Sequence, residues 1–382
     1  MDPTIKSKQQ RIAILTSKAD SLTNFRGPLI GEWISRGLNV YALAPDFDDE
    51  SRNAVLALGA IPTDVHMSRT GRNPIADLWS IISLVFLFRK LKLDMVFCYY
   101  IKPVVYGMLA ARIARVRRRY ALVAGAGYMY SDSSSKNIRH RMLRSAVNWM
   151  CKRGLRSANM VFFQNQDDLE LFHKLGIVNY DLTFLTGGTG VDLRRYSQVQ
   201  PNTSPTTFIL VARLLIEKGI REFAQASREV KENHNNTRFI LLGGLDPNPN
   251  GLDVEEISAW VDEGVLEWPG EVKDVYSWLQ KSSVFVLPSY REGVPRSTQE
   301  AMATGLPVIT CDTVGCRETV IDGETGLLIA PRDVPSLASA MMHFVENPEE
   351  IARMGNAGRE FSEERFDVKK INKKILQSMG IK

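Results

Sequence analysis

The sequence predicts an α/β protein made of two doubly wound domains. Short apolar runs typical of parallel strands alternate with amphipathic stretches typical of helices, and this alternation occurs twice. At 382 residues the chain is long enough for two domains, each with its own core. The strand-like runs are 11–17, 39–45, 95–100, 119–125 and 160–165 in the first half, and 206–212, 238–244, 283–289 and 306–312 in the second.

The domain boundary is predicted near residues 192–206, where periodicity is lost and Pro, Ser, Thr, Asn and Gln accumulate as in a linker. We therefore expect a first domain at 1–195 and a second at 196–359. Residues 360–382 form a charged amphipathic helix pattern with no strand after it. We expect this helix to pack back on the first domain.

The composition, 44% hydrophobic and 24% charged, is that of a soluble globular protein. The polar start and the short apolar run after it do not resemble a signal peptide, so we expect a cytoplasmic protein. The cysteines are too few and too scattered for a disulfide framework, which agrees with a reducing compartment. They are Cys98, Cys151, Cys311 and Cys316.

The charge is unevenly distributed between the two halves. Residues 1–200 hold 28 Lys and Arg against 16 Asp and Glu, whereas residues 201–382 hold 20 against 27. The first half is therefore expected to face something anionic. No nucleic-acid-binding module is recognisable, so an anionic bilayer on the inner face of the cytoplasmic membrane is favoured over nucleic acid. The basic stretches 112–120 and 136–156 are the densest.

The apolar segment 75–88 is shorter than the ~20 residues needed to span a bilayer. It predicts either a buried helix or a helix that also rests on a membrane surface.

Two cations follow the first strand of the second half. Arg213 comes at the end of that strand, and Lys218 precedes Gly219, where a helix is expected to begin. Ligands of open parallel sheets bind at the carboxyl ends of the strands, and a helix N-terminus with two cations suits a diphosphate. Solvated surface charges are the alternative interpretation. Gly243 and Gly244 follow the next strand in the same way.

Two glutamates follow a later strand. Glu292 lies after the strand 283–289, and Gly293 and Pro295 form a tight turn, so a helix is expected to begin near Arg296 and to carry Glu300. Carboxylates accept hydrogen bonds from sugar hydroxyls. A loop glutamate and a helix-capping glutamate are the alternative, but the small residues after Glu300 favour close packing and a ligand site.

Four segments carry a family resemblance: 188–196, 211–219, 292–309 and 322–333. On these the chain resembles the retaining family 4 glycosyltransferases, most strongly over residues 185–370. The resemblance implies the GT-B fold, in which two Rossmann-like domains face each other with the active site in the cleft between them. Segments of the first half resemble bacterial enzymes that extend lipid-linked sugars, including N-acetylgalactosaminyl transferases. These segments are 17–30, 44–50, 99–107 and 121–130.

The resemblance implies roles for individual residues. Arg213 and Lys218 would bind the donor diphosphate and stabilise the leaving group, Glu292 would hold the transferred sugar, and Glu300 would hold the ribose. The other donor-binding residues that it implies are Gly243, Gly244, Lys273, Gly293, Val294 and Pro295. Acceptor or cleft residues would be Asn24, Arg26, Gly27, Lys102, Gly127 and Tyr128.

Other interpretations of these first-half residues stay open. Arg26 could instead pair with a nearby acid, and Lys102 could cap a strand end. Many family members have a histidine in the loop after 121–124, where this chain has Gly125–Tyr128.

The resemblance implies transfer of a hexose or N-acetylhexosamine from a nucleotide diphosphate sugar, by resemblance a UDP sugar. The acceptor would be a polyprenyl-diphosphate-linked glycan in bacterial polysaccharide or glycoprotein assembly. The alternatives are a soluble transferase acting on a small sugar or sugar phosphate, an NAD-dependent oxidoreductase and a non-catalytic nucleotide-binding subunit. The oxidoreductase is disfavoured because no G-x-G-x-x-G opens either half.

No metal and no other cofactor are expected, because Arg213 and Lys218 would neutralise the charge that a divalent ion otherwise neutralises. The nearest metal-binding candidate is the acidic run 46–50, which we interpret as a solvated loop. Cys311 and Cys316 do not have the spacing of a zinc half-site.

Overall fold

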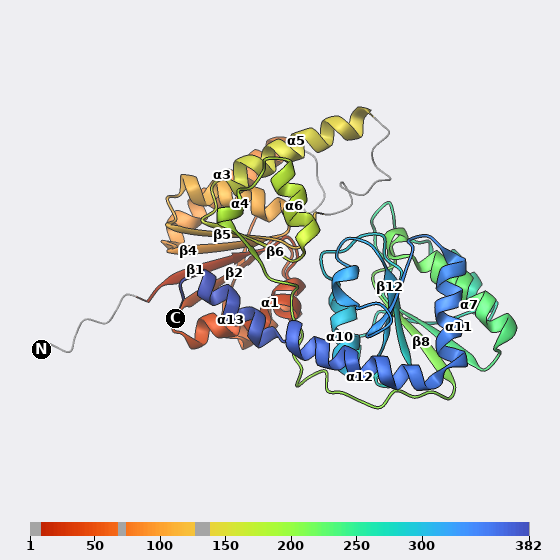
Figure 1. Cartoon of the computed structure of the whole chain (residues 1–382). Coiled ribbons are helices and arrows are strands. Elements are labelled where there is room, and N and C mark those ends of the chain that lie inside the picture. The colour runs from red at the N-terminus through yellow and green to blue at the C-terminus, as the bar shows by residue number, and fades with distance from the viewer. Residues whose placement is uncertain (1–8, 68–73, 127–137, 382) are drawn as a thin grey trace, which may run out of the picture. The chain divides into compact units, whose positions relative to one another are not determined.

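The computed structural model describes residues 9–67, 74–126 and 138–381 (Figure 1). Its two α/β units each contain a parallel sheet with helices on both faces, which confirms the predicted fold class. The first unit is Met1–Thr189 with Ile371–Lys382, and the second is Gly190–Lys370.

The first unit contains a seven-stranded parallel sheet in the order β3-β2-β1-β4-β5-β6-β7. Its strands are β1 (Arg11–Leu15), β2 (Asn39–Ala44), β3 (Ile61–Asp64), β4 (Met95–Tyr99), β5 (Arg118–Val123), β6 (Met160–Phe163) and β7 (Thr183–Leu185). Its helices are α1 (Asp20–Ser35), α2 (Asp49–Ala57), α3 (Pro74–Leu91), α4 (Ile101–Ile113), α5 (Ile138–Leu155), α6 (Gln166–Lys174) and the short η3 (Tyr180–Leu182).

Alternate residues of the central strands bury against opposite faces of this sheet. Ala13 and Leu15 of β1 join a core with α3, α4, α5 and α6. Ile12 and Ile14 join a second core with α1 and with the C-terminal helix α13 (Val368–Ser378). Figure 1 shows α1 and α13 on the same side of this sheet. The doubly covered sheet explains why its central strands are almost wholly apolar.

The second unit contains a six-stranded parallel sheet in the order β10-β9-β8-β11-β12-β13. Its strands are β8 (Thr206–Val211), β9 (Thr237–Leu242), β10 (Glu267–Gly270), β11 (Val284–Leu287), β12 (Val308–Cys311) and β13 (Gly326–Ile329). Its helices are η4 (Ile216–Lys218), α7 (Ile220–Asn233), α8 (Val254–Asp262), α9 (Tyr276–Leu279), α10 (Arg296–Thr304), η5 (Arg317–Thr319), α11 (Val334–Glu346) and α12 (Pro348–Arg365).

Two cores again lie on opposite faces of the sheet. Phe208 and Leu210 of β8 pack with α7, α8 and α11, while Ile209 packs with α9 and α10. The β8 and β11 strands are neighbours, as are β11 and β12, so the loops after these three strands emerge side by side at one edge. This edge holds the predicted donor-binding residues.

The tail differs from the single helix predicted at 360–382. Helix α12 ends at Arg365 and α13 begins at Val368, and the intervening Asp367 accepts a hydrogen bond from the Lys369 amide at 2.9 Å. Ile371 and Ile375 of α13 are buried in the first unit. The second unit therefore extends to residue 370, beyond the predicted limit of 359.

The linker segment also differs from the prediction, which placed the boundary at 195. The Val191 amide donates to the Phe366 carbonyl at 2.8 Å, and the Tyr196 side chain is buried in a core of the second unit. These contacts attach the segment to the second unit from Gly190 onward.

Helix α3 is only partly buried. Leu84 and Phe88 pack into the core, but one stripe of large apolar side chains is exposed. The stripe consists of Ile75, Leu78, Trp79, Ile82 and Phe86, with exposed fractions of 80%, 59%, 62%, 36% and 66%. Among the described residues, no helix combines the length and the apolar character that crossing a membrane requires.

Candidate active site

The chain turns sharply after β8. Leu214 and Leu215 are buried, η4 carries Lys218 at its end, and α7 begins at Ile220. Gly219, at the turn between them, has φ +70°, and a Cβ there would overlap the Pro288 carbonyl oxygen. Only glycine fits this position, so Lys218 is fixed beside the N-terminus of α7, where the partial positive charge of the helix lies.

The loop after β11 leads into α10 as the sequence predicts. Pro295 is the N-cap residue, α10 begins at Arg296, and Glu300 lies within its first turns while Glu292 stays on the loop. Lys218 and Glu292, which are 74 residues apart in sequence, form an ion pair through Glu292 Oε1. Their side chains are 16% and 15% exposed, so water screens this pair little.

The other two predicted residues also form ion pairs. The Nη1 atom of Arg213 lies 2.7 Å from Asp246 Oδ2, and the Nε atom of Arg296 lies 2.8 Å from Glu300 Oε1. The structure thus brings Lys218 and Glu292 together, while Arg213 and Glu300 each contact a residue that the sequence analysis had not assigned.

Gly243 and Gly244 lie beside the segment that carries Arg213. A Cβ at Gly243 would overlap the Ala212 carbonyl oxygen, and one at Gly244 would lie 2.8 Å from Glu271 Oε2. The Gly244 carbonyl accepts the Leu214 amide at 3.1 Å. Gly243 therefore serves close backbone packing beside Arg213, whereas Gly244 leaves room for the Glu271 side chain.

The remaining predicted donor residues differ in how far they are exposed to solvent. Val294 is 4% exposed and packs in a core, so its side chain faces away from solvent. A Cβ at Gly315 would overlap the carbonyl oxygens of Glu292 and Gly293, which places Gly293 against the loop after β12. Lys273 is exposed on the loop that follows β10.

The predicted first-half residues that the structure describes lie on α1 and α4. Asn24 is exposed, but Arg26 is 2% exposed and stacks over the Tyr99 ring at 5.5 Å, and Gly27 packs against Leu58. An arginine this buried presents little of its charge to solvent.

Lys102 neither faces solvent freely nor caps a strand. Its Nζ lies 2.9 Å from Asp77 Oδ1 of α3 and 5.5 Å from the Tyr106 ring. The charge of Lys102 is therefore matched by Asp77. Gly127 and Tyr128 lie outside the described residues.

The four acidic side chains of the run 46–50 are exposed, as expected of a solvated loop, although the loop ends at Asp48 and the last two residues begin α2. Asp46 accepts the Ala19 amide at 2.8 Å, and Asp48 caps α2 by accepting the Ser51 amide at 2.8 Å. In the described part of the chain, no group of three or more His, Cys, Asp or Glu side chains is arranged to hold a metal ion.

Four described residues around the site were not predicted: Asp246, Arg296, Tyr196 and Ser289. Tyr196 is buried, and burial, followed by the neighbouring Glu300 carboxylate, raises the pKa of its hydroxyl. Ser289 hydrogen-bonds Glu292 Oε1 at 2.9 Å. The only sequence signal for Asp246 is its place in a Pro- and Asn-rich turn, which does not identify Arg213 as its partner.

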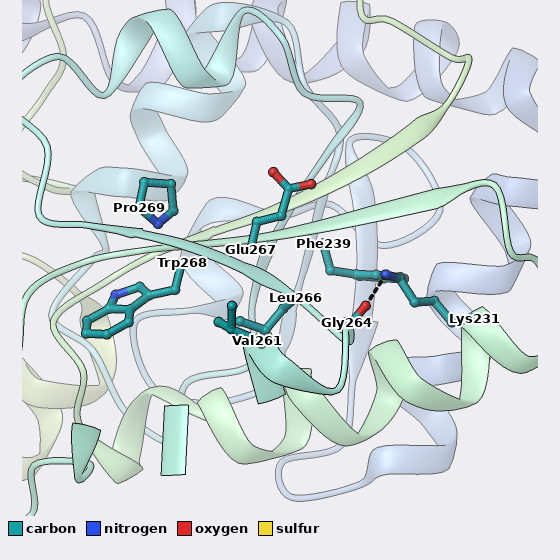
Figure 2. A pocket seen from close by; sticks show the side chains of 8 residues that line it. All are labelled: Lys231, Phe239, Val261, Gly264, Leu266, Glu267, Trp268 and Pro269. Carbon is teal, nitrogen blue, oxygen red and sulfur yellow. Dashed lines mark hydrogen bonds between the residues drawn. The ribbon is translucent and has the colours of Figure 1, made fainter. Parts of the chain in front are cut away.

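A separate open cavity of about 540 Å³ lies along edge strand β10 and contains none of the predicted residues. Figure 2 shows Lys231 beside Gly264 at one end of the cavity, where the lysine donates to the Gly264 carbonyl. The indole of Trp268, which lines the cavity, donates to the Gly243 carbonyl at 3.0 Å. The lining residues are Lys231, Phe239, Val261, Gly264, Leu266, Glu267, Trp268 and Pro269.

Both halves of the chain match known families of glycosyltransferases. Residues 195–361 match the family described as glycosyl transferases group 1, and residues 36–165 match the glycosyl transferase 4-like family. The chain belongs to the family 4-like glycosyltransferases.

This glycosyltransferase has relatives that match most of its length. It is 27% identical over 350 residues to the Campylobacter jejuni N,N'-diacetylbacillosaminyl-diphospho-undecaprenol alpha-1,3-N-acetylgalactosaminyltransferase, covering 88% of this chain and 90% of that one. It is 25% identical over 288 residues to an Escherichia coli UDP-Gal:alpha-D-GlcNAc-diphosphoundecaprenol alpha-1,3-galactosyltransferase, covering 72% of each.

Solved structures share the fold of the glycosyltransferase. Anabaena Alr3699/HepE in complex with UDP-glucose matches with a TM-score of 0.78 at 18% identity, covering 97% of this chain and all of the other. Sucrose-phosphate synthase from Thermosynechococcus elongatus matches with a TM-score of 0.76 at 19% identity, covering 97% and 98% of the two chains.

Proposed function

We propose that this glycosyltransferase moves a hexose or N-acetylhexosamine from a UDP sugar to a polyprenyl-diphosphate-linked glycan. The observation that carries the donor half of the proposal is the contact between Lys218 and Glu292 at the carboxyl edge of the second sheet. The acceptor half rests on the relatives from C. jejuni and E. coli, whose names specify diphosphoundecaprenol-linked acceptors.

The donor would bind across the loops after β8 and β11. Lys218 and Arg213 are the cations available to the diphosphate, and the amides at the start of α7 add to the positive potential. Glu292, next to Lys218, would accept hydrogen bonds from the sugar, and Glu300 from the ribose. In this proposal one donor molecule contacts all four side chains.

We propose that transfer retains the anomeric configuration and needs no metal ion. As the bond from the sugar to the phosphate oxygen breaks, negative charge develops on the leaving diphosphate, where Lys218 and Arg213 stabilise it. That phosphate oxygen can accept the proton of the attacking acceptor hydroxyl on the same face of the sugar. No dedicated general base is then required.

The acceptor would be reached from an anionic membrane surface on the cytoplasmic side. The exposed stripe of α3 offers apolar side chains, and α5, which packs with α3 on α4, exposes Met142 and Trp149. Exposed Arg144, Arg153 and Arg156 on and just after α5 add positive charge. Apolar side chains with neighbouring cations bind such surfaces reversibly. A soluble acceptor would leave the stripe without a role.

The decisive test is a transfer assay with purified protein, a panel of nucleotide sugars and two acceptor classes. We expect product from a UDP hexose or UDP N-acetylhexosamine with a polyprenyl-diphosphate glycan, and activity that survives EDTA. NMR of the product should show the donor's anomeric configuration. Transfer only to water-soluble sugars would exclude the lipid acceptor, and activity restored by Mn²⁺ after chelation would exclude the metal-free mechanism.

A further inference from the structure

Three loops interlock around Glu292, and they follow the neighbouring strands β8, β11 and β12. The Glu217 carbonyl of the first loop accepts the Tyr290 amide of the second at 2.9 Å. The Val314 carbonyl of the third loop accepts the Glu292 amide at 2.9 Å. Both neighbours thus hold the backbone of the second loop.

Ser289 is the side chain at the centre of this arrangement. It is fully buried, and its Oγ lies 2.9 Å from Glu292 Oε1 and 3.0 Å from the Glu217 carbonyl oxygen. The Ser289 carbonyl accepts the Thr313 hydroxyl at 3.0 Å, which ties the same residue to the third loop. A serine hydroxyl has one hydrogen, so it divides this hydrogen between Glu292 and Glu217.

We infer that Ser289 is a positioning residue that orients the Glu292 carboxylate for the transferred sugar. This inference rests on the proposed function. Ser289 and Lys218 both contact Oε1 of Glu292, so the carboxylate is held by two groups and Oε2 is left to accept from a sugar hydroxyl. Without Ser289, Lys218 alone would hold the carboxylate, and a single contact does not fix its rotation.

Gly315 closes the other side of the loop. A Cβ at this position would overlap the carbonyl oxygens of both Glu292 and Gly293. The backbone of Glu292 therefore cannot shift toward the third loop, and rotation of the side chain is the freedom that remains for Ser289 to restrict.

A purely structural role for Ser289 is the competing explanation, because the bond to Glu217 also joins two loops. A double-mutant cycle separates the two. We would measure kcat and donor KM for the wild type, Ser289→Ala, Glu292→Gln and the double variant, together with UDP affinity by calorimetry. Ser289→Ala is expected to lower kcat about tenfold, a loss typical of a hydrogen bond to a charged group, with donor KM and UDP affinity changed less than about twofold.

In the Glu292→Gln background, removal of the Ser289 hydroxyl should not lower kcat further. Ser282→Ala is the matched control, since Ser282 is equally buried and donates to the Trp278 carbonyl at 2.8 Å, away from these loops. It should lower the midpoint of unfolding as Ser289→Ala does but leave kcat unchanged. The near-isosteric Ser289→Cys, a weaker donor, should give an intermediate kcat and serves if the alanine variant does not fold.

The inference would be overturned if Ser289→Ala lowered kcat equally in the wild-type and Glu292→Gln backgrounds. It would also be overturned if Ser282→Ala lowered kcat as much as Ser289→Ala does. Either result would leave the proposed function intact. An active Ser289→Cys with wild-type kcat would also count against the inference. Failure of the wild type to transfer sugar with any donor would overturn the proposed function itself, and the inference with it.

Discussion

At the residue scale, the predicted charged side chains of the site are held in ion pairs. Lys218 pairs with Glu292, Arg213 with Asp246, and Glu300 with Arg296. Each carboxylate holds a long cationic side chain in one orientation. Binding of a diphosphate would therefore cost less side-chain conformational entropy.

Gly219 gives a test at this scale. Gly219→Ala is expected to destabilise the protein more than Gly37→Ala. Both positions have positive φ, but only at Gly219 would the added Cβ meet another part of the backbone, 2.9 Å from the Pro288 carbonyl carbon. The conformational part alone is about 1–2 kcal/mol. Urea unfolding measures the stability of both variants, and donor KM should rise only for Gly219→Ala. Equal effects of the two substitutions would show that the contact with Pro288 is unimportant.

The sequence predicted Lys218 and Glu292 because each belongs to a local pattern with a recognisable turn. It could not predict Ser289, Asp246 or Tyr196 as their neighbours. Asp246 is 33 residues from Arg213, and Tyr196 precedes β8 whereas Glu300, its neighbour in space, follows β11. Such pairs depend on which loops emerge side by side, and that is fixed by strand order rather than by local sequence.

At the element scale, the nine predicted strand segments correspond to the interior strands of the two sheets. The four that were missed, β3, β7, β10 and β13, are the edge strands. An edge strand is covered less completely and needs fewer apolar residues: β3 has the sequence IPTD and β10 has EWPG. Period and hydrophobicity, the signals used, are weakest at these positions.

Helix α3 gives a test at this scale. The double variant Trp79→Glu/Phe86→Glu should reduce retention on anionic liposomes at least about tenfold, since burying a large apolar side chain contributes on the order of 1.5–3 kcal/mol. Co-sedimentation with vesicles is the measurement. Leu56→Glu is the matched control, because Leu56 is 53% exposed on α2 and lies outside the stripe.

The two lipid compositions separate the contributions to retention. Neutral vesicles should retain less wild-type protein than anionic vesicles at the same salt. Unchanged retention of the double variant would rule out α3 as the contact surface, and equal retention on both vesicle types would rule out the electrostatic contribution.

At the scale of the whole molecule, all four thiols are buried. Burial raises the pKa of each, to about 12 for Cys151 and Cys316, from an ordinary value of 9.0. For Cys316 the Glu292 carboxylate adds to the effect. A thiol that stays neutral in the folded state and ionises on unfolding destabilises the fold at high pH.

The thiols should therefore contribute fully to the free energy of unfolding below pH 9. That free energy should fall progressively as the pH rises from 9 toward 12. Urea titrations from pH 7 to 11 measure this trend. A thiol reagent at pH 8 should label the native protein slowly and all four cysteines after denaturation. Rapid labelling of the native protein would contradict the burial of the thiols.

The return of α13 to the first unit has a consequence for biosynthesis. Ile371, Ile375, Leu376 and Met379 complete the core on the α1 face of the first sheet, yet they are synthesised after the whole of the second unit. The first unit is therefore synthesised early but keeps an apolar face uncovered until the second unit has been made. A stop codon just before Ile371 would spare the residues of the second unit and damage the first.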